Sequence, residues 1–351
     1  MTAPQSLTYR DALLESMRTL MRDNPDAIVL GQGADDFKGI FGTTVGLPET
    51  FGAERVMDTP LAEEAVCGIA IGAALNGMYP ILTHIRADFM LLATNQIVNL
   101  AAKYRYMFGG RFRVPMLIRT VVGRSWGQGA QHSQSLQSLF AHIPGLVVLM
   151  PSSPQAILDA YPAAAKLGCP VISFEHRLLY DVAFLPEAPA ADPLSSRRIR
   201  AGKDVTVVAT SIMVLEAKRV AAHLANFGID CDVIDLNVLT SPDWDMVLES
   251  VRRTGRLLIA DTSWLPYGVA SEVCRIVCER AHAALSAPVV CLGMAPSPCP
   301  TAKALEDIFY PNLHDFGDAI ARLVTGRTDH GIPLPDETSM ADVYKKFKGP
   351  F

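Results

Sequence analysis

Two adjacent acidic residues, Glu63 and Glu64, begin the run EEAVCGIAIGAALNG, which is otherwise small and apolar. A carboxylate held in a dry, apolar pocket has a raised pKa, which suits it to exchange a proton near neutral pH. An acid at a helix start is also favoured simply by the helix dipole. From the residues alone, both a catalytic and a structural interpretation of Glu63 stay open.

A polar loop, GQGAQHSQS at residues 127–135, follows the apolar segment VPMLIRTVVG. Its glycines allow the backbone to approach a ligand closely, and Gln131 and His132 offer hydrogen-bond donors and acceptors. Open α/β sheets bind ligands in loops at the carboxyl ends of their strands. The loop is therefore a candidate binding site, with an ordinary polar loop as the alternative.

The segment HIRADF, residues 84–89, lies where the apolar run PILTHI ends and a helix begins. Phe89 could stack on a flat ring, although core packing is the commoner fate of a phenylalanine. Arg86 could recognise an anionic substrate or simply pair with Asp88. No His or acidic residue recurs at metal-ligand spacing, so no metal site is predicted in this chain.

A regular framework must position these residues. Strand-like and helix-like segments alternate along the first half, with helices expected over 61–76 and 88–107. Their continuous apolar strands indicate a parallel sheet with helices on both faces, which is an α/β fold. The expected strands lie in DAIVLGQG, PILTHI, VPMLIRTVVG, LVVLMP and PVISFEH.

A second alternating unit begins at DVTVVATS, after a stretch rich in Pro, Ala and charge. The sequence thus predicts an α/β domain over residues 1–185, a linker over 186–203 and a second, smaller α/β domain over 204–326. The remaining residues, 327–351, form a polar tail.

Composition narrows the class of protein. The 351 residues are 50% hydrophobic and carry a net charge of −5, so large cores are expected and nucleic-acid binding is not, because no basic patch is present. Seven scattered cysteines fit a reducing cytoplasm, with core packing favoured over metal binding for Cys274 and Cys278. No signal peptide or membrane span is predicted, since glycines and a proline interrupt the uncharged residues 65–85.

Several segments, in order along both domains, resemble the β subunit of the thiamine diphosphate-dependent component of 2-oxoacid dehydrogenase complexes. This is the pyruvate, branched-chain and acetoin family within the transketolase-like group. The resemblance implies a pyrimidine-binding domain followed by a transketolase C-terminal-like domain. It also implies decarboxylation of a 2-oxoacid, or cleavage of an acyloin, with transfer of the product unit to an acceptor such as lipoamide. The segments include DTPLAEEAVCGIAIGAAL, NQIVNLAAKYRYMFGG, GAQHSQSL and DVTVVATSIMVLEA.

The resemblance assigns roles to individual residues. Glu63 matches the family glutamate that bonds a pyrimidine nitrogen and promotes the imino tautomer, which then removes the thiazolium proton. Phe89 matches the aromatic residue that packs on the pyrimidine, and Leu61 and Ile85 match its apolar neighbours. His132 matches the active-site histidine of the β subunit, and Gln131 beside it has a supporting role at most.

Glu64 has no counterpart in the family. It lies about 100° from Glu63 around a helix, so we expect it at a partner contact or in a salt bridge.

The resemblance also implies a partner. The sequence lacks the Gly-Asp-Gly…Asn-Asn motif that binds Mg²⁺ and the diphosphate in thiamine diphosphate enzymes. In this family a separate α subunit carries that motif, so an α2β2 heterotetramer is expected, with a lipoyl acyltransferase core as a possible larger partner.

Two rival functions are weighed against this one. In a split, two-chain transketolase-like enzyme acting on a sugar or ketose, Arg86, Arg119 and Arg124 could bind a phosphate or carboxylate. Ordinary arginines at the surface or core rim are the equal alternative. A non-catalytic scaffold subunit is the other, and the presence of both Glu63 and His132 argues against it.

Overall fold

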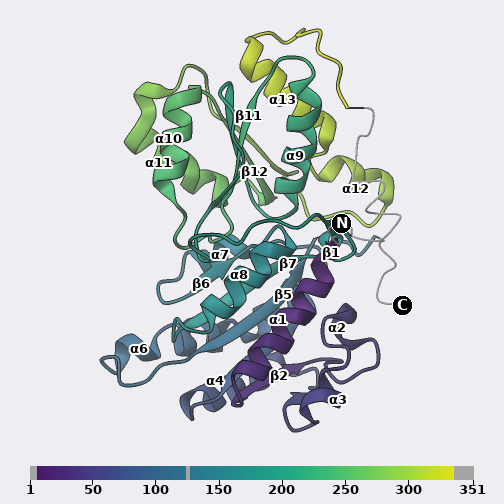
Figure 1. Cartoon of the computed structure of the whole chain (residues 1–351), viewed down its shortest axis with the longest axis vertical. Coiled ribbons are helices and arrows are strands. Elements are labelled where there is room, and N and C mark those ends of the chain that lie inside the picture. Colours follow the sequence, from purple (N-terminus) through teal and green to yellow (C-terminus); the bar gives the residue numbers. More distant parts are fainter. Residues whose placement is uncertain (1–5, 124–126, 336–351) are drawn as a thin grey trace, which may run out of the picture. The chain divides into compact units, whose positions relative to one another are not determined.

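The structure is a computed structural model that describes residues 6–123 and 127–335. Its described residues divide into two compact units, of which the first comprises residues 6–123 and 139–194, and the second residues 127–138 and 195–335. Each unit contains its own sheet flanked by helices (Figure 1). The predicted α/β class is therefore confirmed.

The first unit is built on a six-stranded sheet whose strands all run parallel, in the order β3-β2-β4-β5-β7-β6. Every residue of β2, β4, β5 and β7 is buried, which explains why these strands read as apolar runs without alternation. The strands are β2 Ala27–Gly31, β3 Val56–Met57, β4 Tyr79–His84, β5 Met116–Val122, β6 Val147–Leu149 and β7 Pro170–His176.

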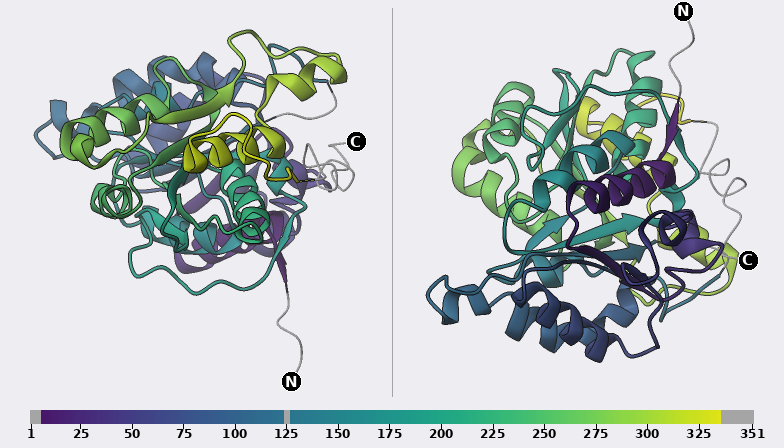
Figure 2. Two further views of the ribbon diagram at one scale, coloured as in Figure 1. Left: turned by 90° about the horizontal axis from the view of Figure 1, so that it is seen from above. Right: turned by 60° about the horizontal axis from the view of Figure 1, so that its bottom comes forward.

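Helices cover both faces of this sheet. Helix α1 (Tyr9–Asp23) packs on α8 (Pro154–Ala164), and the right-hand view of Figure 2 shows α1 on one side of the strands and the chain from α4 to α6 on the other. Helix α4 spans Glu63–Leu75, within the helix predicted over 61–76. The smaller elements are β1 Leu7–Thr8, α2 Gly39–Gly42, α3 Leu47–Phe51, η3 Arg177–Leu179 and β8 Ala183–Phe184. Helix α7 (Gln137–Ala141) begins with two residues of the second unit and continues in the first.

The chain is helical over residues 87–107, as predicted over 88–107, but the helix is irregular. The chain there forms α5 (Ala87–Met90), a 3-10 turn η1 (Leu91–Ala93), a π-helix η2 (Gln96–Ala101) and α6 (Tyr104–Met107). Both η1 and η2 contact α4. Apolar spacing does not distinguish these helix types here, because each irregular piece is only three to six residues long and covers little more than one turn.

A fully buried ion pair ties β5 to β7. Arg119 donates from Nε and Nη2 to the two carboxylate oxygens of Glu175, at 2.6 and 2.9 Å, and from Nη1 to Thr43 at 3.2 Å. The hydroxyls of Tyr161 and Tyr180 donate to the same carboxylate, at 2.7 and 2.6 Å. Arg119 therefore has a structural role, and the phosphate-binding role considered for it is wrong. Arg124 lies outside the described residues.

The second unit is built on a five-stranded sheet in the order β13-β12-β10-β11-β9, in which β9 alone runs antiparallel. Strand β9 falls within the stretch 186–203, where the composition suggested a linker. Its arginines Arg198 and Arg200 pair with Asp232 and Asp230, so a charged segment can serve as an edge strand. The strands are β9 Arg197–Arg200, β10 Val205–Ala209, β11 Cys231–Asp235, β12 Leu257–Trp264 and β13 Val290–Met294.

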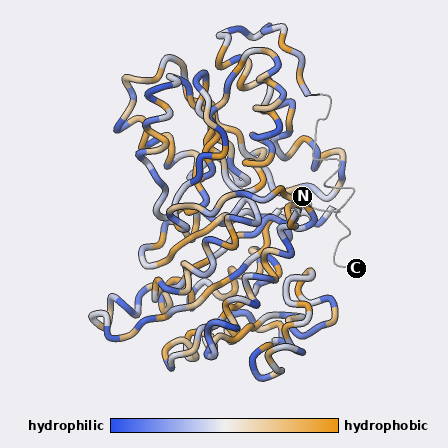
Figure 3. Tube along the Cα trace, in the orientation of Figure 1, coloured by the Kyte–Doolittle hydropathy of each residue, from blue (hydrophilic) through white to orange (hydrophobic). Residues whose placement is uncertain are grey.

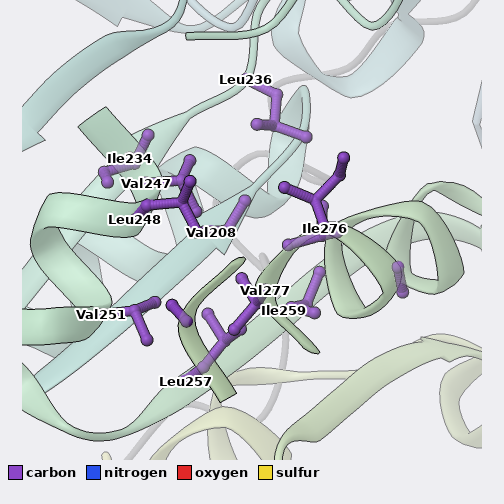
Figure 4. Packing of buried hydrophobic residues seen from close by; sticks show 13 residues of the cluster. Val208, Ile234, Leu236, Val247, Leu248, Val251, Leu257, Ile259, Ile276 and Val277 are labelled. Carbon is purple, nitrogen blue, oxygen red and sulfur yellow. The ribbon is translucent and has the colours of Figure 1, made fainter. Parts of the chain in front are cut away.

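The core of the second unit lies between this sheet and helices α10 and α11, where Val208, Val251 and Ile259 belong to one hydrophobic cluster (Figure 4). Figure 3 shows the helices alternating between hydrophobic and hydrophilic residues, as expected for helices that bury one face. The helices are α9 Ile212–Ala225, α10 Trp244–Thr254, α11 Val269–Ala281, η4 His282–Ala284, α12 Lys303–Phe309 and α13 Leu313–Thr325.

Candidate active site

The parallel register of β2, β4 and β5 brings their carboxyl ends to one edge of the first sheet. Gly31 pairs with Thr83, and His84 pairs with Thr120. The candidate residues Ile85, Arg86 and Phe89 follow directly from the end of β4. Loops at such an edge are the usual ligand sites of parallel sheets.

Glu63 is the first residue of α4 and is half-buried. Gln32, the residue after β2, donates from Nε2 to Glu63 Oε1 at 3.4 Å. Nearby, the backbone N–H of Gly33 donates to Asp58 Oδ1 at 2.6 Å, which ties the segment before α4 to the end of β2. Among the described residues Glu63 Oε2 has no hydrogen-bond partner, so one carboxylate oxygen is available to a ligand.

Glu64 has a different environment from its neighbour. It accepts a hydrogen bond at Oε1 from Gln96 Nε2, 2.8 Å away in the π-helix. This hydrogen bond joins α4 to η2, and no salt bridge of Glu64 is present among the described residues. The expected partner contact stays a prediction. The two acids thus differ in their neighbours and in exposure, since Glu63 is half-buried beside the end of β2 and Glu64 is exposed and bonded to η2.

Three apolar residues are candidates for contacting a ring. Leu61 precedes Glu63 by two positions, and Ile85 and Phe89 follow the end of β4. Leu61 is 83% exposed, whereas Ile85 and Phe89 are half-buried. An exposed leucine two residues before a half-buried carboxylate leaves apolar surface that the described part of the first unit does not cover.

Arg86 is buried, and burial lowers its pKa to about 10, opposed by the charge of Asp88 and by Tyr180. It donates from Nη1 to the carbonyl of Ile85 at 2.7 Å, and its Nε has no hydrogen-bond partner among the described residues. Its guanidinium carbon lies 5.6 Å from the ring centre of Phe41. The charge of Asp88 therefore acts on Arg86, as the pairing alternative expected. The anion-binding role of Arg86 stays a prediction.

His84, the last residue of β4, is buried, and this burial lowers its pKa to about 4. The unfolded chain takes up a proton near pH 6.5, whereas the folded chain does so only near pH 4. Folding stability is therefore highest above pH 6.5 and falls as the pH drops toward 4, by about 3 kcal/mol at 1.36 kcal/mol per pH unit. Urea denaturation of His84→Leu should show a correspondingly smaller loss over this range.

The exposed His142 provides a matched control, because His142→Leu also removes one histidine from the first unit. An acid dependence in His84→Leu as steep as that of the parent protein would mean that His84 does not resist protonation in the folded state.

The loop with Gln131 and His132 belongs to the second unit. His132 is half-buried, its backbone N–H donates to the carbonyl of Gly129 at 3.3 Å, and Gln131 is exposed. Gly127 and Gly129 have φ of +68° and +71°, and a Cβ at either would lie 2.6 Å from an oxygen of Thr301. The loop therefore needs both glycines for its conformation and its close approach to Thr301.

The end of this loop is attached through hydrogen bonds to the buried carboxylate of Asp261. Gln137 is fully buried and donates from Nε2 to Asp261 Oδ1 at 2.9 Å. The hydroxyl of Thr210 and the backbone N–H of Thr262 donate to the same oxygen, each at 2.8 Å. Burial raises the pKa of Asp261, and these hydrogen bonds partly offset it. No local sequence pattern predicts that Gln137 and Asp261 contact each other and hold the loop that carries His132.

The candidate residues thus fall in two groups. Leu61, Glu63, Ile85, Arg86 and Phe89 lie in the first unit, and Gln131 and His132 in the second. Within residues 6–123 and 127–335, no group of three or more His, Cys, Asp or Glu side chains could hold a metal ion. In the same residues, every helix is too short or too polar to cross a membrane.

Family models and a solved structure show the architecture to which this chain belongs. A family model described as "Transketolase, pyrimidine binding domain" matches residues 5–182, and one described as "Transketolase, C-terminal domain" matches residues 195–315. A solved structure of a split-gene transketolase, an inactive β4 tetramer, superposes with a TM-score of 0.74 and 24% identity, over 92% of this chain and 99% of that one. The chain therefore has the transketolase-like two-domain architecture.

Curated relatives narrow the class further. The acetoin:2,6-dichlorophenolindophenol oxidoreductase β subunit of Cupriavidus necator is 39% identical, with 92% of this chain and 98% of the relative covered. The pyruvate dehydrogenase E1 β subunits of Rhizobium meliloti and Rickettsia felis are 36% and 35% identical, covering 91% and 90% of this chain and 70% and 98% of theirs. The chain belongs to the transketolase-like family of pyruvate and acetoin dehydrogenase E1 β subunits, and the predicted resemblance is confirmed.

Proposed function

We propose that this chain is the β subunit of a thiamine diphosphate-dependent enzyme. The enzyme decarboxylates a 2-oxoacid, or cleaves an acyloin, and transfers the resulting unit to an acceptor such as lipoamide. The observation that carries the proposal is Glu63, a half-buried carboxylate at the start of α4 with one oxygen free of partners among the described residues. The names of the relatives, which act on pyruvate and acetoin, support the substrate class.

The residues present fit the pyrimidine ring of this cofactor. Glu63 Oε2 is free to bond a ring nitrogen, and Leu61, Ile85 and Phe89 offer apolar surface for the ring faces. Thiamine diphosphate supplies the electron sink needed to break a bond next to a carbonyl. The protein's part is to bind and orient the ring and to exclude water.

Two side chains of this chain can move protons. Glu63 can share or give up a proton at Oε2, because its other oxygen is held by Gln32. His132 carries an imidazole, whose ring nitrogens can donate or accept a proton. Gln131 has at most a supporting role, and Arg86 is proposed as a weaker candidate for an anionic substrate group.

The proposed partner is an α subunit that binds the diphosphate of the cofactor and supplies most of the ligands of Mg²⁺. The sequence of this chain lacks the motif for that task. The assembly is an α2β2 heterotetramer, which acts in the cytoplasm and passes its product to a lipoyl acyltransferase core. The E1 β relatives support the existence of an α partner.

Calorimetric titration of thiamine diphosphate with Mg²⁺ tests the proposal. The titration is performed on this chain alone and on the chain co-expressed with its α subunit. Binding only in the pair, lost with Phe89→Ala, is the expected result. Equal, tight binding to the lone chain would contradict the shared site, and no binding in either sample would favour a scaffold subunit.

Disruption of the loop anchor should impair turnover without removing any proposed catalytic group. Gln137→Leu removes the donor to Asp261 while keeping a similar volume, so the His132 loop loses one attachment. We expect kcat to fall about 10- to 100-fold, the range that misplacement by about 1 Å can cause. Steady-state kinetics measures the fall, and limited proteolysis within residues 127–136 measures the loosening.

Ser138→Ala is the matched control, because the adjacent Ser138 hydroxyl has no hydrogen-bond partner among the described residues. Equal kcat values for Gln137→Leu and the parent enzyme would show that this anchor does not position His132.

A further inference from the structure

Two cysteines of the second unit lie with their sulfur atoms in contact. Cys274 is in the middle of α11, and Cys291 is on β13, the edge strand of the sheet. Their Sγ atoms are 3.7 Å apart, although 17 positions separate them in the sequence. Both are half-buried and pack at the rim of the hydrophobic cluster shown in Figure 4. The pair therefore combines proximity with partial access from solvent.

We propose that Cys274 and Cys291 form a reversible oxidation site, at which a small disulfide of the glutathione class converts the two thiols into an intrachain disulfide. The Cys274 thiolate attacks one sulfur of the oxidant and expels a thiolate, which leaves a mixed disulfide. Cys291 loses its proton to solvent, attacks Cys274 Sγ and expels the second thiolate. The protein gives up two electrons and two protons, and the oxidant becomes two free thiols.

The contact itself prepares Cys274 for the first step. The hydrogen bond shared by the two sulfur atoms lowers the pKa of Cys274 to about 7 against the opposing effect of burial, and the same contact raises the pKa of Cys291. Thiolates are the attacking species in exchange with disulfides. Burial raises the pKa of Cys67 and of Cys231 to about 12, so those two thiols should stay inert.

The geometry demands little movement. A disulfide has a sulfur–sulfur distance of about 2.05 Å, so the two atoms must approach by about 1.7 Å from their separation of 3.7 Å. Side-chain rotation together with a small shift of the edge strand can supply this. Strand β13 pairs with one neighbour only, and its residues 290–293 are only half-buried, so it has freedom to adjust.

The bond would link α11 to the edge strand. Closing the 17-position segment restricts the unfolded chain and so raises the resistance of the second unit to unfolding. A transient, reversible disulfide of this kind is consistent with a reducing compartment, where disulfides that occur are usually catalytic or redox-sensing.

Cys278 provides a matched control. It lies on the same helix one turn beyond Cys274, and it is the exposed cysteine of the set. A reaction governed by exposure alone would modify Cys278 first, whereas a reaction governed by the thiol pair would join Cys274 to Cys291.

The test uses the full-length chain incubated with oxidised glutathione, followed by alkylation of the remaining thiols and non-reducing peptide mapping. We expect a peptide that links Cys274 to Cys291 and that disappears after treatment with a dithiol. Cys278→Ser should give the same link. Cys291→Ser should stop at glutathione bound to Cys274, and it should not show the higher unfolding temperature expected of the oxidised parent chain.

Two results would overturn the proposal. The first is stable glutathione on Cys274 of the parent chain with Cys291 still open to alkylation. The second is modification of Cys278 while Cys274 and Cys291 both remain reduced. Neither readout involves turnover or cofactor binding, so the outcome is independent of the proposed function.

Discussion

Replacing Glu63 with glutamine is expected to lower kcat of the assembled enzyme by about 10²- to 10⁴-fold, the usual contribution of a positioned proton-transfer group. The amide keeps the size of the side chain and an oxygen that can accept from Gln32, but it cannot hold or release a proton. Steady-state kinetics of the variant co-purified with its α subunit measures the loss. Titration calorimetry of thiamine diphosphate with Mg²⁺ shows whether the cofactor still binds.

The adjacent Glu64→Gln is the matched control. Glu64 is an acid on the same helix turn, and its hydrogen bond from Gln96 can persist to an amide oxygen. We expect a change in kcat of less than about threefold, which corresponds to well under 1.4 kcal/mol. A large loss in both variants would point to damage to α4, and no loss in Glu63→Gln would remove Glu63 from the mechanism.

Replacing Arg119 with methionine should destabilise the first unit by about 3–5 kcal/mol, the usual cost of leaving one member of a buried ion pair uncompensated. Arg119 and Glu175 are both fully buried, and their two hydrogen bonds join neighbouring strands of the sheet. Urea or guanidinium denaturation followed by circular dichroism measures the loss of unfolding free energy.

The double variant Arg119→Met with Glu175→Gln separates charge from packing. The amide that replaces the Glu175 carboxylate would carry no charge, and its oxygen can still accept from Tyr161 or Tyr180, so part of the lost stability should return. If the double variant were instead less stable than Arg119→Met, the lost stability of Arg119→Met would not come from the uncompensated charge of Glu175.

The fold followed from local patterns wherever these patterns are strong. The apolar runs in PILTHI and VPMLIRTVVG correspond to the buried strands β4 and β5, because strands covered on both faces need apolar residues at every position. Helix α4 starts at Glu63, within the range that its small and apolar residues predicted. The change of helix type between residues 88 and 107 was not predicted, and the 3-10 and π-helical pieces there both contact α4.

The site was only partly visible in the sequence. Glu63, Phe89 and His132 stand in motifs that resemble those of the family, and their roles stay predictions until the variants are measured. Gln137 and Asp261 could not be paired from local pattern, because 124 positions separate them and either residue alone reads as an ordinary polar residue. Likewise, the charged segment Arg197–Arg200 pairs with β11 as an edge strand, and two of its arginines form ion pairs with Asp230 and Asp232, which local composition did not indicate.

The anchor of the His132 loop has a consequence for biosynthesis. Residues 124–138 are made early, but the carboxylate that holds Gln137 is made 124 positions later. At about 5–20 residues per second, the ribosome needs roughly 6–25 s to cover that distance. During this interval the sheet of the first unit can form, whereas the loop with His132 has no docking partner at Asp261. The first sheet, with Glu63, can therefore form before the anchor of the His132 loop, which becomes available only after about three quarters of the 351 residues have been made.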